Sequence, residues 1–241
     1  MSRVSQPNKT TRSLINIAGI VAVATLISKL FGLVRQQAIA AAFGVGPAIG
    51  AYNFAYVIPG FLLILLGGIN GPFHSAIVSV LAKRKREEVA PIVETITTLV
   101  IGVLLLVMIG LVVFADPLMH LVAPGLFRSE QELRSLGATP EVIQITYQTR
   151  DIAIQQFKIM APMAVLAGLI GIGFGTLNAA DQYWLPSISP LFSSVTVLAG
   201  LGGLALYLGD KIVLPEYAAF GGAVLAWTTL AGALLQWLVQ L

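Results

Sequence analysis

Residues 92–115 read IVETITTLVIGVLLLVMIGLVVFA, an apolar run that carries a single charge, Glu94. A helix needs roughly 20 mainly apolar residues to cross a bilayer, so this run predicts a membrane-spanning helix. The whole chain agrees, because 57% of its 241 residues are hydrophobic and 10% are charged, against about 25% charged residues in an ordinary soluble domain. One core of this length cannot hide so much apolar surface, which excludes a soluble enzyme, a disordered segment and a nucleic-acid-binding module.

The same measure applied to the rest of the chain predicts an all-α integral membrane protein with six spans. The short alternating segments that form membrane barrels are not seen in the sequence. The first span is expected to stay uncleaved, because Lys29 and Arg35 separate its apolar run from the small residues at 40–42. The expected organisation is a basic tail at 1–13 and spans at about 14–43, 48–82 (broken near 67–72), 92–115, 154–177, 184–208 and 217–241.

Basic residues in the connections predict the orientation. The tail carries Arg3, Lys9 and Arg12, and residues 83–86 read Lys-Arg-Lys-Arg, the densest basic run in the chain. Both are expected in the cytoplasm, where residues 83–86 also meet anionic lipid, and the polar segment 116–150 is expected outside. That segment is either a lid or strut on the outer face or an inert loop. The sequence stops inside the sixth span without a polar tail, which predicts a fragment of a longer protein.

Two cations lie in the first span, where a charge costs at least ~2.5–3.5 kcal/mol and normally faces protein or water. Lys29 and Arg35 are about 120° apart around a helix of 3.6 residues per turn, and Gln36 shares the side of Lys29. We expect these three side chains to form the wall of a cavity for an anionic substrate. The alternative is that the cations snorkel to the interface. Lys158, near the start of the fourth span, either lines the same cavity or lies at the interface.

Glycine and proline interrupt the second span, where residues 67–72 read Gly-Gly-Ile-Asn-Gly-Pro. A straight helix over 48–82 would be too long for one crossing, so we expect a break at which the proline opens a second half-helix. Free N–H groups at such a start attract anions. The residues assigned to the hinge are Gly67, Gly68, Gly71 and Pro72, and those assigned to substrate binding at the break are Asn70 and His74. The alternative is a kink that only shapes the bundle.

The expected spans contain no catalytic or metal-binding constellation. The chain has no cysteine, and its two histidines, His74 and His120, are far apart in sequence. This excludes thiolate chemistry and argues against a histidine-based metal site, and no cofactor is expected. Gly171 and Gly175 lie in an apolar span with no preceding strand, so they predict close helix packing and not a dinucleotide-binding loop. The sequence therefore indicates a transporter or channel and not an enzyme.

Several motifs resemble those of the lipid II flippases, the MurJ/MviN family of the MOP exporter superfamily. Residues 28–35, SKLFGLVR, are similar to the first-helix signature of that family. Residues 123–125, Ala-Pro-Gly, resemble the family's segment after its third helix, and residues 177–186, LNAADQYWLP, resemble its connection between helices four and five. Further similarity at residues 51–59 and 226–236 extends the resemblance over nearly the whole chain.

This resemblance implies a fourteen-helix protein with two six-helix lobes around a central cavity, of which this chain would be the N-terminal lobe. It implies a flippase of the bacterial inner membrane that moves the undecaprenyl-pyrophosphate-linked peptidoglycan precursor outward by alternating access, for cell-wall synthesis and cell shape. Lys29 and Arg35 would then hold the pyrophosphate. The chain departs from the family pattern, since Lys29 stands where arginine is usual, which replaces a bidentate grip with a point charge. Gly50 stands in place of an aspartate, and residues 70–73 read Asn-Gly-Pro-Phe in place of Glu-Gly-Ala-Phe.

The sequence is also compatible with two other functions. One is export of another lipid-linked saccharide or of an amphiphilic substrate, and the other is a non-transporting membrane scaffold for cell-wall synthesis. The expected partners are an anionic lipid-linked substrate, membrane lipids, a second C-terminal lobe and cell-wall synthesis enzymes, with no nucleic acid.

Overall fold

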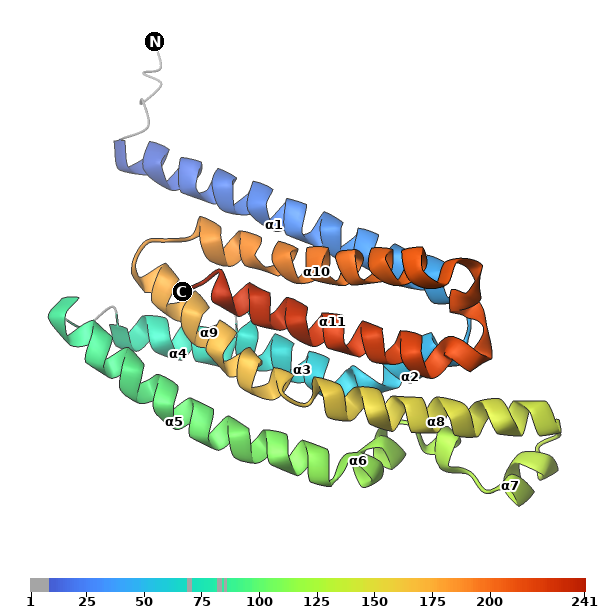
Figure 1. The fold of residues 1–241 in the computed structure, drawn as a ribbon. Helices are drawn as coiled ribbons and strands as arrows, with labels where there is room; N and C mark the ends of the chain where they lie inside the picture. The colour runs from blue at the N-terminus through green and yellow to red at the C-terminus, as the bar shows by residue number, and fades with distance from the viewer. Residues whose placement is uncertain (1–8, 69–70, 82–83, 85) are drawn as a thin grey trace, which may run out of the picture.

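The computed structural model describes residues 9–68, 71–81, 84 and 86–241, without the side chains of residues 9–17, 86 and 87. Every regular element among these residues is helical (Figure 1). The elements are α1 (Lys9–Phe43), α2 (Pro47–Ala55), α3 (Val57–Gly67), α4 (Pro72–Leu81), α5 (Arg86–Val113), α6 (Ala115–Val122), the 3-10 helix η1 (Pro124–Phe127), α7 (Glu130–Ser135), α8 (Pro140–Met160), α9 (Met163–Ala179), α10 (Trp184–Leu208), the 3-10 helices η2 (Gly209–Val213) and η3 (Pro215–Tyr217), and α11 (Ala218–Leu238).

Five stretches are long and apolar enough to cross a membrane, and the bent pair α8–α9 makes up to six. The five are Ala18–Phe43, Val57–Leu81, Glu88–Val113, Trp184–Val213 and Pro215–Leu238. The predicted all-α membrane fold is thereby confirmed. Long apolar helices are the expected solution, because a helix satisfies its own backbone hydrogen bonds inside the bilayer.

The region of the expected fourth span is organised differently from a single helix over 154–177. α8 already begins at Pro140, where the Thr139 side chain accepts a hydrogen bond from the Val142 N–H. α9 follows α8 after a bend of 40°. Pro162 at the bend has no N–H to donate, which interrupts the helical ladder. The polar segment 116–150 accordingly contains α6, η1, α7 and the first half of α8.

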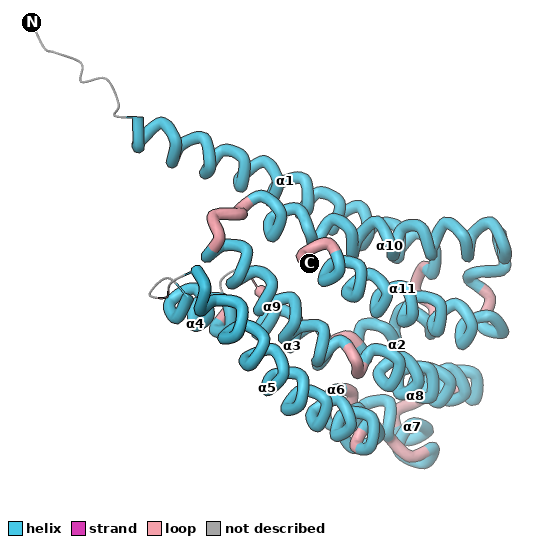
Figure 2. Tube along the Cα trace, turned by 60° about the vertical axis from the view of Figure 1, so that its left-hand side comes forward, coloured by secondary structure: helices cyan, strands magenta, loops and turns pink. Residues whose placement is uncertain are grey.

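The chain runs back and forth between the two ends of an elongated bundle (Figure 1). The start of α1, the end of α4, the start of α5, the α9–α10 connection and the C-terminus lie at one end, which we name the N-terminal end. The α1–α2 and α10–α11 connections lie at the opposite end. α9 is the central helix, because it packs against α3, α4, α5 and α11 and most of its residues are buried. Figure 2 shows it between α11 on one side and α4 with α5 on the other.

Buried apolar side chains form a main core and a smaller second core. The main core includes Phe157 and Met160 of α8, and side chains of α3 pack against it. The second core joins Ile77 and Leu81 of α4 to Ile172 of α9. The interruption between α3 and α4 therefore separates helices that belong to different cores.

Gly171 and Gly175 bring α9 against the interrupted span, which confirms the packing role predicted from their spacing. A Cβ atom added at Gly171 would collide with the carbonyl oxygen of Leu66, at the end of α3. One added at Gly175 would lie 2.8 Å from Ile77 of α4. Only residues without a Cβ atom allow this approach, so α9 fixes the positions of both α3 and α4.

Candidate functional site

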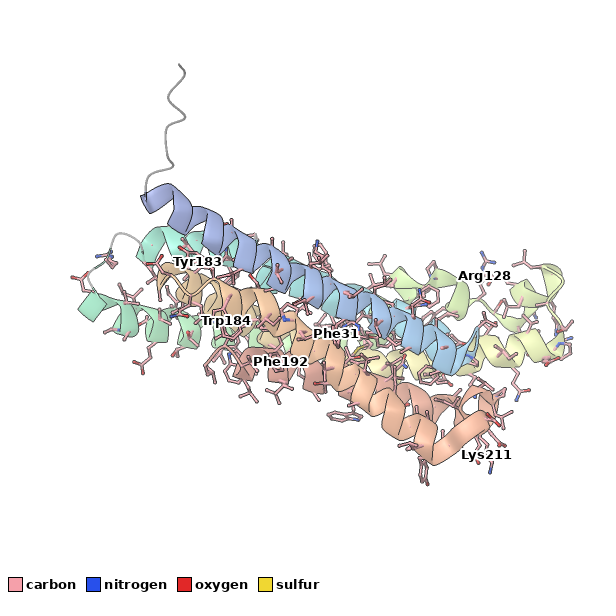
Figure 3. All side chains as sticks on the ribbon, turned by 90° about the horizontal axis from the view of Figure 1, so that it is seen from above. Phe31, Arg128, Tyr183, Trp184, Phe192 and Lys211 are labelled. Atoms are coloured by element: carbon pink, nitrogen blue, oxygen red, sulfur yellow. The ribbon has the colours of Figure 1, made fainter. Side chains whose placement is uncertain are left out.

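α1 lies along α10 and leaves much of its remaining surface exposed. Its buried positions are Ala24, Ser28, Ile39 and Phe43, which recur at helical spacing. The Ser28 hydroxyl donates a hydrogen bond of 2.8 Å to the Ser187 carbonyl oxygen of α10. Figure 3 shows the two helices side by side, with Tyr183 and Trp184 near the start of α10. The rest of α1 is thus free to face lipid, water or another part of the protein.

Arg35 lies near the end of α1, ahead of the connection to α2. Its side chain is half-buried, and its Nε atom is buried without a hydrogen-bond partner among the described residues. In the segment that follows this connection, the Tyr52 ring stacks on that of Tyr56 with centroids 5.5 Å apart, and the Tyr52 hydroxyl lies 3.1 Å from the Thr229 hydroxyl of α11. The Tyr52 hydroxyl thus ties α2 to α11.

Lys29 and Gln36 lie on the exposed part of α1. No described acidic side chain forms an ion pair with Lys29 or Arg35. The two cations are about a third of a turn apart, as expected from six residues of helix. Together they give α1 two cations without an ion-pair partner among the described residues.

The interrupted span has the helix limits expected from its glycines and proline. α3 ends at Gly67, Gly68 continues in an extended conformation, and α4 begins at Pro72. Asn70 lies outside the described residues. His74, in the first turn of α4, has its Nε2 atom 2.6 Å from the Nδ2 atom of Asn178 at the end of α9. His74 therefore contacts α9, and the structure does not place it beside Lys29.

Lys158 lies near the end of α8, a helix that packs against α2 and α11. Its Nζ atom is 3.8 Å from an Asp116 carboxylate oxygen of α6, and both side chains are substantially exposed. The structure therefore joins Lys158 to the segment that contains α6 and does not bring it together with Lys29 and Arg35.

Sequence reasoning missed the polar groups of the bundle interior. Gln156 of α8 is fully buried, and its Nε2 atom donates to the carbonyl oxygen of Gly222 at 2.9 Å and to that of Ala48 at 3.4 Å. This amide joins α8 to α11 and α2. The sequence feature that could have identified this buried amide is a glutamine in a stretch that continues into an apolar span. Tyr52 and Tyr56 also escaped the residue-by-residue reasoning, since neither carries a charge.

The comparison with known proteins decides the family. A family model described as "Lipid II flippase MurJ" matches residues 39–241. The chain belongs to this family. The MurJ family consists of flippases and not enzymes, so the prediction of a non-enzymatic multi-pass membrane protein is confirmed.

Three MurJ proteins show how far the similarity extends. The chain is 61% identical to the probable lipid II flippase MurJ of Synechocystis, over 99% of this chain and 41% of that protein. It is 28% identical to the lipid II flippase MurJ of Burkholderia cenocepacia, over 95% of this chain and 39% of that protein. It is 29% identical to the probable lipid II flippase MurJ of Rhizobium meliloti, over 93% of this chain and 38% of that protein. The chain thus spans about two fifths of the length of these MurJ relatives.

Proposed function

We propose that this chain is the N-terminal lobe of a lipid II flippase, which moves the undecaprenyl-pyrophosphate-linked saccharide from the inner to the outer leaflet. The observation that carries the proposal is the pair of cations on α1, which form no ion pair with a described acidic side chain, with the Nε atom of Arg35 buried and without a hydrogen-bond partner among the described residues. A buried donor without a partner is unfavourable by about 1–3 kcal/mol, and more for a charged group. A pyrophosphate oxygen supplies the missing acceptor and charge.

Arg35 and Lys29 have different tasks in the proposed site. The planar guanidinium of Arg35 has several donors in fixed directions, so it orients the pyrophosphate. The flexible Lys29 ammonium adds a point charge on the exposed side of α1, and Gln36 beside it offers an amide to the headgroup. The polyprenyl tail remains in the bilayer, since moving its apolar surface into water is unfavourable.

Alternating access needs an element that can change its position, and the interruption between α3 and α4 supplies one. The glycines at positions 67, 68 and 71 and Pro72 form the proposed hinge, with Asn70 beside it. α3 rests on the main core and α4 on the second core, so the hinge joins two separately packed parts. The contact between His74 and Asn178 holds α4 against α9 in the present conformation. Lys158, paired with Asp116, has no part in the proposed site.

The proposed orientation places the N-terminal end of the bundle in the cytoplasm of a bacterium, with the protein in the inner membrane. The basic residues of the tail at 1–13 and the basic run at 83–86 support it. Because the native chain has no cysteine, single cysteines at positions 85 and 131 can be labelled in intact cells. Position 131 should react with an impermeant thiol reagent and position 85 only after permeabilisation. The reverse pattern would refute the orientation.

The proposed function is tested by complementing a flippase-depleted bacterium with the full-length gene. Rescue of growth, together with exposure of lipid II in the outer leaflet, is the expected result. Binding of cell-wall synthesis enzymes without rescue would support a scaffold instead. Rescue of a different lipid-linked saccharide export defect alone would support a related exporter.

A further inference from the structure

A furrow runs between α4 and α5 towards the N-terminal end of the bundle. Both helices pack against α9, whereas close contacts between α4 and α5 are few. An apolar cavity of about 310 Å³ opens in this furrow. It is lined by Pro72, Phe73, Ala76, Ile77, Val80 and Ile96.

A second, larger cavity continues the furrow. Its volume is about 920 Å³, and its lining includes Leu81, the neighbour of Val80, and Val93, one turn from Ile96. This cavity is also lined by polar groups, which are Arg84, Glu94, Thr176 and Asp181. The furrow is therefore apolar along its length and polar at the N-terminal end. This pattern suits a molecule that has an apolar acyl chain and a polar headgroup.

We propose that this furrow binds one phospholipid of the bilayer whose headgroup carries hydrogen-bond donors beyond the phosphate. One acyl chain fills the apolar cavity, the phosphate meets Arg84, and headgroup hydroxyl or ammonium donors reach the carboxylates of Glu94 and Asp181. The proposal goes beyond the proposed function and concerns a surface away from α1, and of the proposed hinge residues only Pro72 lines the furrow.

Two physical arguments select this occupant. The apolar cavity lies between the candidate spans Val57–Leu81 and Glu88–Val113, so an acyl chain of the bilayer matches its apolar lining. An empty furrow would leave its lining without dispersion contacts on one side. The polar cavity presents the carboxylates of Glu94 and Asp181 beside Arg84, which also lies 3.9 Å from a Glu88 carboxylate oxygen. The carboxylates of Glu94 and Asp181 accept hydrogen bonds from a donor-bearing headgroup.

Lipid retention by the purified, delipidated full-length protein tests the proposal, with native mass spectrometry as the readout. Phosphatidylethanolamine and phosphatidylcholine carry the same net charge, but only the first has headgroup N–H donors. Phosphatidylethanolamine and phosphatidylglycerol should bind about tenfold more tightly than phosphatidylcholine, the effect of about one charge-assisted hydrogen bond. Glu94→Ala should reduce the preference for ethanolamine over choline, and Arg84→Gln should weaken retention of both by about fivefold. Equal binding of the three lipids, or tighter binding of undecaprenyl pyrophosphate, would overturn the proposal.

The apolar cavity is tested by filling it. Ala76 is exposed in the furrow, so Ala76→Trp should reduce lipid retention at least tenfold without disturbing the core. Ala231→Trp, at an exposed position of α11, is the matched control and should retain lipid as the native protein does. In the unmodified protein, a phosphatidylethanolamine with a diazirine in its acyl chain should label residues 72–80 and 96 preferentially. Even labelling of all exposed helices, or equal retention by the two tryptophan variants, would refute the site.

Discussion

The cations of α1 and those of the α6–α8 region differ in how their charges are satisfied. Lys29 and Arg35 lie in a candidate span and form no ion pair with a described acidic side chain. Lys158 pairs with Asp116, and Arg134 pairs with Glu130 across one turn of α7, in the polar segment. Arg150 has both a carboxylate partner, Asp151, and the faces of two aromatic rings.

This difference separates structural charges from functional ones. An exposed ion pair contributes about 0–1 kcal/mol, so its loss is easily tolerated. An unpaired cation in a membrane-spanning helix is unfavourable, and it persists when water or an anion meets it. The paired cations of the α6–α8 region are therefore expected to be dispensable for transport, and the cations of α1 are expected to be needed for it.

The largest effect is expected from removing both α1 cations. Lys29→Ala combined with Arg35→Ala should lower the rate of outward lipid II movement by about 100-fold or more, since two charge-assisted contacts are lost. Lys158→Ala is the matched control and should stay within about twofold of the native rate, as expected for an exposed pair. The measurement is flipping in proteoliposomes at equal protein levels. Lys29→Arg should keep the activity, because the charge remains. Native flipping by the double variant would remove the proposed site.

The next effect concerns packing at the interrupted span. Gly171→Ala places a methyl group against the Leu66 carbonyl oxygen and should destabilise the fold by about 1–3 kcal/mol. Gly202→Ala, where an added Cβ meets nothing within 4 Å, should be neutral or slightly stabilising. Denaturant unfolding in detergent measures both. Equal stability of the two variants would mean that α9 is not held as tightly as described.

A smaller effect is expected from the interior amide of α8. Gln156→Leu removes two hydrogen bonds to backbone carbonyls of α2 and α11, each worth about 0.6 kcal/mol between membrane helices. The loss should be about 1 kcal/mol in the same unfolding assay. Gln155→Leu changes the exposed neighbour and should have little effect. Equal unfolding free energies for the two leucine variants would mean that the Gln156 amide does not stabilise the contact between the helices.

The smallest effect is a pH dependence at the α9–α10 connection. The hydrogen bond from the Tyr183 hydroxyl to Asp181, 2.8 Å long, raises the pKa of Tyr183 above its usual value of 10. A folded pKa above the unfolded one means that the stabilisation is present below pH 10 and disappears as the pH rises through the folded value. The difference in unfolding free energy between the native protein and Tyr183→Phe should therefore shrink above pH 10. Tyr207→Phe serves as the exposed control, and a difference that stays constant with pH would contradict the assignment.

The sequence by itself determined the class of protein and the chemistry of its first helix. Apolar runs of spanning length fix an all-α membrane fold, because hydropathy and helical hydrogen bonding are properties of neighbouring residues. The glycines and Pro72 marked the limits of α3 and α4 for the same reason. Lys29 and Arg35 stood out because a charge in an apolar run is unfavourable wherever the rest of the chain lies.

Only the tertiary structure decided which side chains meet. For Lys158 and His74, a place at the cavity of Arg35 was one of two alternatives, and in the structure Lys158 pairs with Asp116 and His74 contacts Asn178. The Arg35 Nε atom is instead buried without a hydrogen-bond partner among the described residues, and Gln156 joins three helices that no local pattern connects. The partner of a side chain depends on which face of its helix packs against which distant segment. That choice follows from shape complementarity, such as the approach that Gly171 allows, and not from the order of residues in any one helix.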